Sequence, residues 1–280
     1  MTKALLFLSV FSSGFAFAQE DLLKDIDTIK TDTEFSQPAF KALQIVTGQS
    51  TKLAAKKEWY IIVAHRFGDV STGFKNFFGL DNASTKLGVI YGISDAISVS
   101  LSRETNMKTF EGAAKYRLIR QNDDFPVDIV GYNVMGVNTD LSKDNYPFLT
   151  FNDRLSYLTQ ALISRRFNDK LSLQLTPSYV YKNLYEPKNE DKNQFLAGLG
   201  GRYKISKRVS VNAEYFVNFD NHSFYKNPLS LGVDIETGGH VFQLLFSNSQ
   251  INSDIGYLTN ASGEWGKGHI FFGFNLYRVF

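Results

Sequence analysis

The carboxy-terminal segment 270–280 places the tightest constraint on the fold. Its alternate positions Ile270, Phe272, Phe274 and Leu276 are apolar, and the chain ends in Phe280. A period of two indicates a β-strand with one apolar face. A final strand of this kind is typical of a bacterial outer-membrane β-barrel, in which these residues form the signal for the barrel-insertion machinery. We therefore expect a closed wall of strands, with function inside the wall or in its loops.

The amino terminus predicts export. Lys3 precedes the apolar run 4–10, and Ala16 and Ala18 are small residues at the two positions that a signal peptidase reads. We expect a signal peptide at 1–18, cleaved after Ala18. The alternative is a membrane-anchoring helix, but serines and a glycine interrupt the apolar run. No other stretch approaches the ~20 apolar residues of a membrane helix, so an integral mature chain must span the membrane as strands.

Composition fits this interpretation. Mean hydropathy is −0.19 and charged residues make up 21% of the chain, which a barrel tolerates because only alternate residues face lipid. Aromatic residues, at 15%, suit the girdles at the membrane interfaces. The absence of cysteine excludes disulfides, thiolate metal sites and a lipoprotein anchor. With 30 basic and 28 acidic side chains, nucleic acid is not indicated as a partner.

In twelve segments, apolar and polar residues alternate, or the residues are apolar throughout. All of them reach the length that a tilted membrane strand needs, about 9–11 residues. They are 58–67, 84–93, 96–104, 109–121, 126–138, 154–167, 170–183, 193–206, 208–220, 229–237, 240–250 and 268–280. The even number is typical of bacterial barrels. The expected fold is all-β: a closed antiparallel transmembrane barrel over 58–280, preceded by a periplasmic segment at 19–57.

Loop lengths alternate along the chain. Short turns at 94–95, 121–125, 168–169, 206–207 and 237–239 follow every second strand, whereas the connections between them are longer, except near Asn106. Outer-membrane barrels have short periplasmic turns and longer extracellular loops. The asymmetry predicts that both ends of the mature chain lie in the periplasm. A soluble β-sandwich would also show alternating faces, but it gives no reason for this asymmetry.

Two faces can be assigned along most strands. In 97–102, for example, apolar residues alternate with Ser98, Ser100 and Ser102, and the polar face of a barrel points into the lumen. The first strand, 59–67, is too uniformly apolar to assign. Arginines on the expected lipid face lie near strand ends, where the head group can reach water; they are Arg103, Arg120, Arg165 and Arg278.

The same parity places charged side chains in the lumen. The basic ones are Lys86, Lys115, Arg117, Arg166, Lys182, Arg202 and Lys204, and the acidic ones are Glu111, Asp128, Glu214, Asp234 and Glu236. One interpretation is a water-filled passage with mild anion preference. The other is a salt-bridged filling of a narrow barrel. Inward Leu158, Leu162, Leu196 and Phe216 favour a filled or ligand-holding interior, as an apolar passage would also require.

Residues 19–57 have two interpretations. They form a periplasmic tail, or the part at 40–46 enters the barrel as a plug or an extra strand.

Chemistry-bearing motifs are sparse. The histidines His65, His222, His240 and His269 have no adjacent nucleophile in sequence, although His269 could pair with a loop serine at the rim of the barrel. Leu199-Gly200-Gly201 lacks the lysine and helix of a phosphate loop, and acidic loop residues match no calcium loop. We expect no enzyme, cofactor or metal site; an outer-membrane lipid hydrolase is the less favoured exception.

Three stretches resemble an uncharacterised family of Bacteroidota β-barrel proteins: 65–69 (HRFGD), 77–81 (FFGLD) and 87–95 (LGVIYGISD). The resemblance implies a barrel in the outer membrane and supplies no catalytic residue. The chain departs from a common outer-membrane pattern because the third residue from the end is Arg278 and the aromatic is Tyr277.

These observations predict an outer-membrane channel or transporter for small solutes, in contact with outer-membrane lipid. The alternative is a non-conducting barrel whose extracellular loops bind a surface partner, above all 250–268 with Tyr257 and Trp265.

Overall fold

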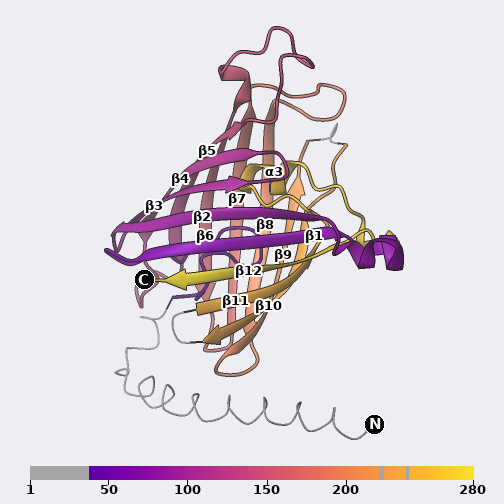
Figure 1. Ribbon diagram of the computed structural model, residues 1–280. Helices are drawn as coiled ribbons and strands as arrows, with labels where there is room; N and C mark the ends of the chain where they lie inside the picture. Colours follow the sequence, from indigo (N-terminus) through magenta and orange to yellow (C-terminus); the bar gives the residue numbers. More distant parts are fainter. Residues whose placement is uncertain (1–37, 221–223, 238–239) are drawn as a thin grey trace, which may run out of the picture. The chain divides into compact units, whose positions relative to one another are not determined.

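The computed structural model describes residues 38–220, 224–237 and 240–280, where twelve antiparallel strands form one closed barrel (Figure 1). The expected signal peptide, with its cleavage after Ala18, lies outside the described residues, as does His222. The strands are β1 Trp59–Asp69, β2 Ala83–Ser94, β3 Ile97–Glu104, β4 Thr109–Ile119, β5 Asp128–Asn138, β6 Leu155–Arg166, β7 Leu171–Lys182, β8 Asn193–Lys204, β9 Val209–Asn218, β10 Leu229–Thr237, β11 His240–Ser247 and β12 Phe271–Val279.

The predicted fold class is confirmed. Each strand pairs with its neighbours in sequence, and β1 pairs with β12 to close the wall. Strand boundaries differ most from the prediction at Ser247 and Phe271, beside the longest inward-folded loop. Closure leaves no exposed sheet edge, which an open sheet would present as unpaired backbone groups.

The closing pair also shows which face of β1 points inward. Ala64 and Arg66 are buried, whereas Trp59 and Ile61 are exposed. Arg66 lies beside Gly273 of β12, where an added Cβ would come within 2.7 Å of its side chain. The faces of 59–67 could not be assigned from the sequence, because several inward positions of β1 are apolar too.

Long and short connections lie at opposite ends of the barrel, as predicted. The long loops carry the short helices η1 Val70–Gly79, η2 Asn152–Arg154, α3 Asp254–Thr259 and η3 Trp265–Lys267. Within the described residues, every helix is too short or too polar to cross a membrane.

Two segments outside the wall occupy the lumen. The first, residues 39–55, is called the N-terminal insert; it is mostly buried and contacts inward side chains of strands around the barrel. A single bridge, Gln44↔Gln49, is its only described strand-like pairing, so it is an internal segment rather than an added strand. The tail interpretation does not hold for residues 39–55.

The second segment, residues 248–261, is called the loop insert and contains α3. All six residues of α3 are buried, and the exposed fraction of Tyr257 is 1%. The prediction that 250–268 presents Tyr257 to a surface partner is therefore wrong. The loop folds inward because its polar residues find partners on the lumen wall, while Trp265 stays at the rim and donates to the Leu229 carbonyl at 3.0 Å.

Candidate functional site

Glu214 of β9 binds both inserts. Its carboxylate accepts hydrogen bonds from the backbone N–H groups of Val46 (3.3 Å), Thr47 (2.7 Å) and Gly48 (2.9 Å). The Tyr257 hydroxyl of the loop insert donates to the same carboxylate at 2.8 Å. Successive N–H groups in a tight turn form a concave site for an anion. Glu214 therefore has a structural partner on each insert.

The turn that Glu214 holds has little space for a side chain. The Ile45 N–H donates to the Gly48 carbonyl at 2.8 Å and closes the turn. A Cβ on Gly48 would lie 3.0 Å from both the Glu214 carboxylate and the Phe216 ring. A glycine at this position lets the backbone approach the wall closely.

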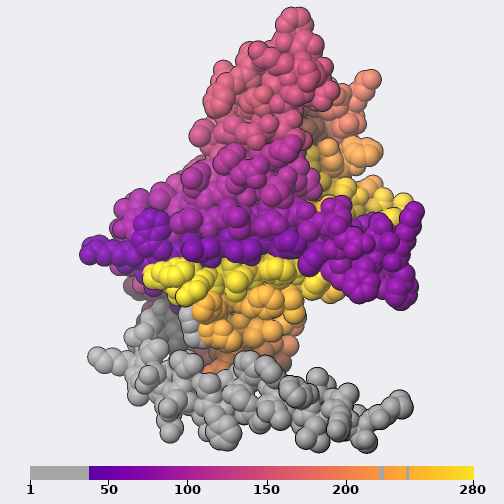
Figure 2. Space-filling view, in the orientation of Figure 1, coloured from indigo at the N-terminus to yellow at the C-terminus, as the bar shows by residue number. Residues whose placement is uncertain are grey.

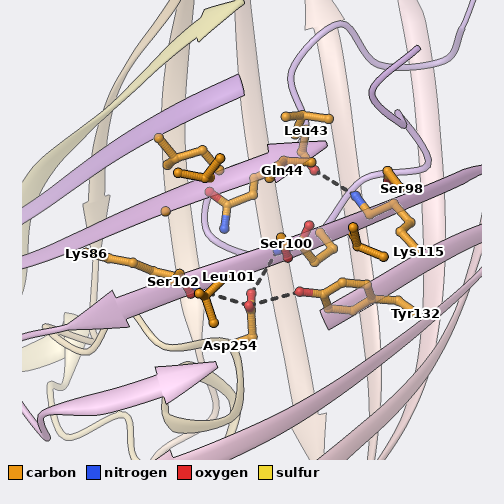
Figure 3. Close-up of a pocket in the computed structure, with 16 residues that line it drawn as sticks. Leu43, Gln44, Lys86, Ser98, Ser100, Leu101, Ser102, Lys115, Tyr132 and Asp254 are labelled. Carbon is orange, nitrogen blue, oxygen red and sulfur yellow. Dashed lines mark hydrogen bonds and ion pairs between the residues drawn. The ribbon is translucent and has the colours of Figure 1, made fainter. Parts of the chain in front are cut away.

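Lys115 of β4 binds the N-terminal insert from the other side of the lumen. Its ammonium donates to the Leu43 carbonyl at 3.2 Å (Figure 3). It also donates to the carbonyls of Ser50 (2.9 Å) and Lys52 (3.1 Å), which uses all three of its protons. Arg117 donates to the Thr51 carbonyl at 3.2 Å. The two basic lumen side chains of β4 thus satisfy carbonyls of a segment that has no regular secondary structure.

A buried ion cluster fixes the start of α3. The Lys86 ammonium lies 2.9 Å from the Glu111 carboxylate and 3.1 Å from that of Asp254. Glu111 in turn accepts from the N–H groups of Asp254 and Ile255. The Tyr132 hydroxyl donates to Asp254, as Figure 3 shows, at 3.0 Å. Such a cluster is favourable only because each charge has partners.

The inserts also bind each other directly. Gln49 of the N-terminal insert donates to Asp254 of the loop insert at 2.8 Å. Together with the shared contact at Glu214, this hydrogen bond means that displacement of one insert removes partners of the other.

Most of the other predicted lumen charges have partners too. Arg202 pairs with Glu236 at 2.9 Å, and Glu236 also pairs with Lys41 at 2.6 Å. The further pairs are Arg117 with Asp128, Lys182 with Glu190 and Arg166 with Asp169, and Asp234 accepts from Gln243. Lys204 is half-buried at the turn end of β8. Anion preference stays a prediction, because the lumen charges bind each other and the inserts.

One side of the lumen is apolar. Leu158, Leu162, Leu196 and Phe216 are buried there and belong to the same cluster as Leu53, Ile255 and Leu258 of the inserts. The inserts therefore pack hydrocarbon against these strands in addition to forming hydrogen bonds with the wall.

A small cavity remains between the inserts and strands β2 to β4. Its volume is about 40 Å³, room for water and for nothing larger. Ser98, Ser100 and Ser102 line it from β3, opposite Gln44 and Gln49 of the N-terminal insert (Figure 3). The space exists because the serine side chains are short.

Residues 40–280 match a known family, the "Membrane bound beta barrel domain (DUF5777)". The chain belongs to this family. The match starts at Phe40, so the N-terminal insert from that residue onward is part of the family's domain. The Bacteroidota origin implied by the resemblance stays a prediction.

Solved porins share the fold of this membrane-bound barrel. The NanC porin is 11% identical, with 79% of this chain and 98% of the porin covered and a TM-score of 0.50. The KdgM porin is 10% identical, with 79% and 99% covered and a TM-score of 0.51. None of the curated proteins matches the chain. The membrane location is confirmed, and a single-chain antiparallel barrel with an even number of strands has outer-membrane architecture.

Arginines on the outer face of this membrane-bound barrel lie at strand ends, beside aromatic rings. Arg103 stacks over Phe110 at 5.4 Å, Arg165 over Phe167 at 5.0 Å and Arg278 over Phe280 at 4.7 Å. Arg120 is exposed just beyond β4. On β12, Phe272, Phe274 and Leu276 alternate with the buried Phe271, Gly273, Asn275 and Tyr277, so the apolar face of the expected insertion signal points outward. Recognition by the insertion machinery stays a prediction.

The rim histidine does pair with a serine. His269 Nδ1 lies 2.6 Å from the Asp69 carboxylate and 3.0 Å from the Ser71 hydroxyl. A proton relay needs the carboxylate on one ring nitrogen and the nucleophile on the other. Here both partners use Nδ1, and Asp69 also accepts from the Ser71 N–H at 2.8 Å, as an N-cap of η1. The geometry is that of a helix cap and does not support the hydrolase alternative.

Several wall residues that hold the inserts could be placed in the lumen from the sequence, but their partners could not be identified. Gln49, Asp254, Tyr257 and Ser230 contact partners far away along the chain, and the non-strand segments among them have no periodic signal. Glu214 was identified as lumen-facing, but its partners could not be.

Proposed function

We propose that the protein is an outer-membrane channel for small solutes whose passage is closed by the N-terminal insert and the loop insert. One observation carries the proposal: the lumen is occupied by two segments that are not part of the wall and that hydrogen-bond to it through side chains. The strand pairing that closes the wall includes neither segment.

The size of the barrel supports a passage. Barrels of about eight strands are filled by their own side chains, whereas those of 16–18 strands leave an aqueous channel. Twelve strands lie between these cases. Short side chains on β3, including Ser98 and Ser102, leave room beside the inserts rather than fill the lumen. A wall evolved only for rigidity has no need of two separate segments to occupy it.

The similar structures are named porins, and one is described as the KdgM porin in complex with disordered oligogalacturonate. At this level of identity, the likeness supports the barrel as a scaffold for passage and leaves the solute to experiment.

A redox-controlled lock tests the closed-channel proposal. The hydroxyl oxygens of Thr51, on the N-terminal insert, and Ser164, on β6, lie 2.7 Å apart, and the chain has no cysteine. In the double variant Thr51→Cys/Ser164→Cys, a disulfide would fix the insert to the wall. Single-channel recordings from the refolded protein in planar bilayers should show no openings in the oxidised form. Openings should appear after reduction with dithiothreitol.

A matched variant places the disulfide within the wall. Gln160 and Ser178 are paired on β6 and β7, with side chains 2.9 Å apart. The variant Gln160→Cys/Ser178→Cys should conduct alike when oxidised and reduced. Silence of the reduced Thr51/Ser164 variant, with folding confirmed by heat-dependent gel mobility, would contradict the proposal. It would favour the alternative of a non-conducting barrel whose inserts are a permanent filling.

A further inference from the structure

A second cavity opens at the long-loop end of the barrel. Its volume is about 250 Å³, and its walls come from the loops around β5–β6 and β7–β8. Ser253, Ile255, Gly256 and Asn260 of the loop insert also line it. We call this cavity the vestibule. A solute that enters from outside meets the loop insert here, before it reaches the N-terminal insert.

The vestibule holds buried polar groups at its base. Lys182 and Glu190 have exposed fractions of 8% and 7%, and their charged atoms are 2.6 Å apart. Lys182 also donates to the Asn260 side chain at 3.2 Å, and Gln194 donates to Glu190 at 3.0 Å. Buried charges with this many partners are held in fixed positions, as a binding site requires.

The upper walls combine aromatic rings with single charges of both signs. Tyr146, Tyr185 and Tyr225 line the cavity together with Asp153, Arg154 and Glu186. The Arg154 guanidinium donates to the Asn138 carbonyl at 3.2 Å. One Asp153 oxygen accepts from the Thr150 N–H and hydroxyl, both at 2.7 Å. The vestibule therefore offers donors, acceptors and ring faces to an incoming solute.

Charges of both signs disfavour a charged solute. Lys182 and Glu190 neutralise each other, which leaves the Arg154 guanidinium and the two carboxylates of Asp153 and Glu186, one carboxylate in excess. An anion would face two carboxylates and a cation would face the guanidinium. A neutral molecule with many hydroxyl groups can both donate and accept, and its C–H faces pack on tyrosine rings. The volume is below that of drug-sized pockets, which limits the solute to a small molecule.

We propose that the vestibule is a binding site for a neutral, hydroxyl-rich solute of monosaccharide size, and that binding there loosens the loop insert. The second part rests on the proposed channel function. A solute that hydrogen-bonds Lys182 or Asn260 competes with their mutual contact, and Asn260 directly follows α3. The Asn260 N–H closes the last turn of α3 on the Gly256 carbonyl at 2.8 Å. The solute thus acts on the helix that covers the lumen.

Three sugars of the same ring size test the solute class. Binding of D-glucose, D-glucuronate and D-glucosamine to the refolded protein, in a detergent without a sugar head group, can be compared by titration calorimetry and saturation-transfer NMR. We expect saturable binding of glucose, with the charged analogues at least several-fold weaker. Tyr185→Ala and Arg154→Gln should each weaken glucose binding about tenfold or more. The outward-facing Tyr203→Ala serves as the control and should leave it unchanged.

The locked variant separates this inference from the channel proposal. Oxidised Thr51→Cys/Ser164→Cys should still bind glucose, because the disulfide lies within the barrel and away from the vestibule. In the reduced form, glucose should raise the frequency of openings. Absence of saturable glucose binding, or preference for either charged sugar, would overturn the assigned class. Glucose binding that leaves opening unchanged in a conducting protein would overturn the coupling alone, and a silent protein that binds glucose would contradict only the channel.

Discussion

Among single residues, Glu214 has the widest set of contacts with the inserts. A carboxylate that accepts three backbone N–H groups and a tyrosine hydroxyl is a strong anchor, because hydrogen bonds to a charged group are roughly twice as strong as neutral ones. Lys115 is the corresponding anchor for carbonyls, because its ammonium donates to three of them in the N-terminal insert. At these two positions, a lumen charge that could tune selectivity in an open pore instead binds the inserts.

Replacing Glu214 with glutamine should therefore open the channel. Glu214→Gln keeps the shape of the side chain and removes its charge, and we expect the inserts to lose about 2 kcal/mol of contact energy. That loss corresponds to roughly a thirtyfold rise in the open population, visible as more frequent single-channel openings. Glu264→Gln, on the surface of the loop before β12, should leave opening unchanged. Equal opening in the two variants would show that Glu214 does not hold the inserts.

The carboxylate of Asp153 stabilises the loop between β5 and β6, and its pKa predicts how this loop responds to acid. The backbone N–H of Thr150, with its hydroxyl, holds the pKa of Asp153 below its usual range. The stabilisation it gives is complete above the ordinary carboxyl pKa near about 4 and is lost as the pH falls through the lower folded value. Hydrogen exchange at the Thr150 amide, corrected for intrinsic rates, should show constant protection from pH 8 to 5. Asp153→Asn should lower that protection throughout, and an unchanged variant would contradict the contact.

Among the elements, η1 extends from the rim of the wall as an exposed aromatic segment (Figure 2). Phe74 is 83% exposed and Phe77 58%. Phe77 and Phe78 have left-handed backbone angles, φ 43° and 55°, which are strained for bulky residues. Gly79 (φ 86°) fits because a Cβ there would lie 2.3 Å from the Gly68 carbonyl oxygen. The rings of Phe74 and Phe78 pack edge to face, with centroids 4.8 Å apart.

We expect the rings of η1 to lie in the membrane interface, where aromatic side chains concentrate. A fluorophore on Phe78→Cys should be quenched by brominated lipids in proteoliposomes. The same label on Phe148→Cys, a 94% exposed position in the loop after β5, should not be quenched. Adding Gly79→Ala should shift the segment and reduce quenching at position 78. Equal quenching at positions 78 and 148 would contradict this placement.

For the whole molecule, loop asymmetry predicts the orientation of the barrel in the membrane. Long loops such as 139–154 lie at one end of the barrel, and turns such as 205–208 lie at the other, together with the carboxy terminus. Since the chain contains no cysteine, a single introduced cysteine shows on which side of the membrane its position lies. An impermeant maleimide added to intact cells should label Asn145→Cys and leave Lys207→Cys unlabelled until the outer membrane is broken. The reverse labelling pattern would show that the topology is the opposite of the predicted one.

The sequence by itself determined the wall of this protein. Period-two alternation is a local property of each strand, so the twelve strands, their even number and the two ends of the barrel could be predicted from segments such as 97–102 and 229–237. The lumen charges could be identified by parity for the same reason. The strand boundaries were predictable to within a few residues because turn residues mark them.

Only the tertiary structure decided what fills the wall. The Val46–Glu214 contact spans 168 residues of sequence, and Gln49–Asp254 spans 205. The inserts have almost no regular secondary structure, so their backbone groups must find partners elsewhere, and those partners are set by closure of the barrel. A lumen charge such as Lys115 or Glu214 can face either water or a buried backbone group. Which of the two it faces is decided by the closed barrel with its inserts. A single strand carries no information about it.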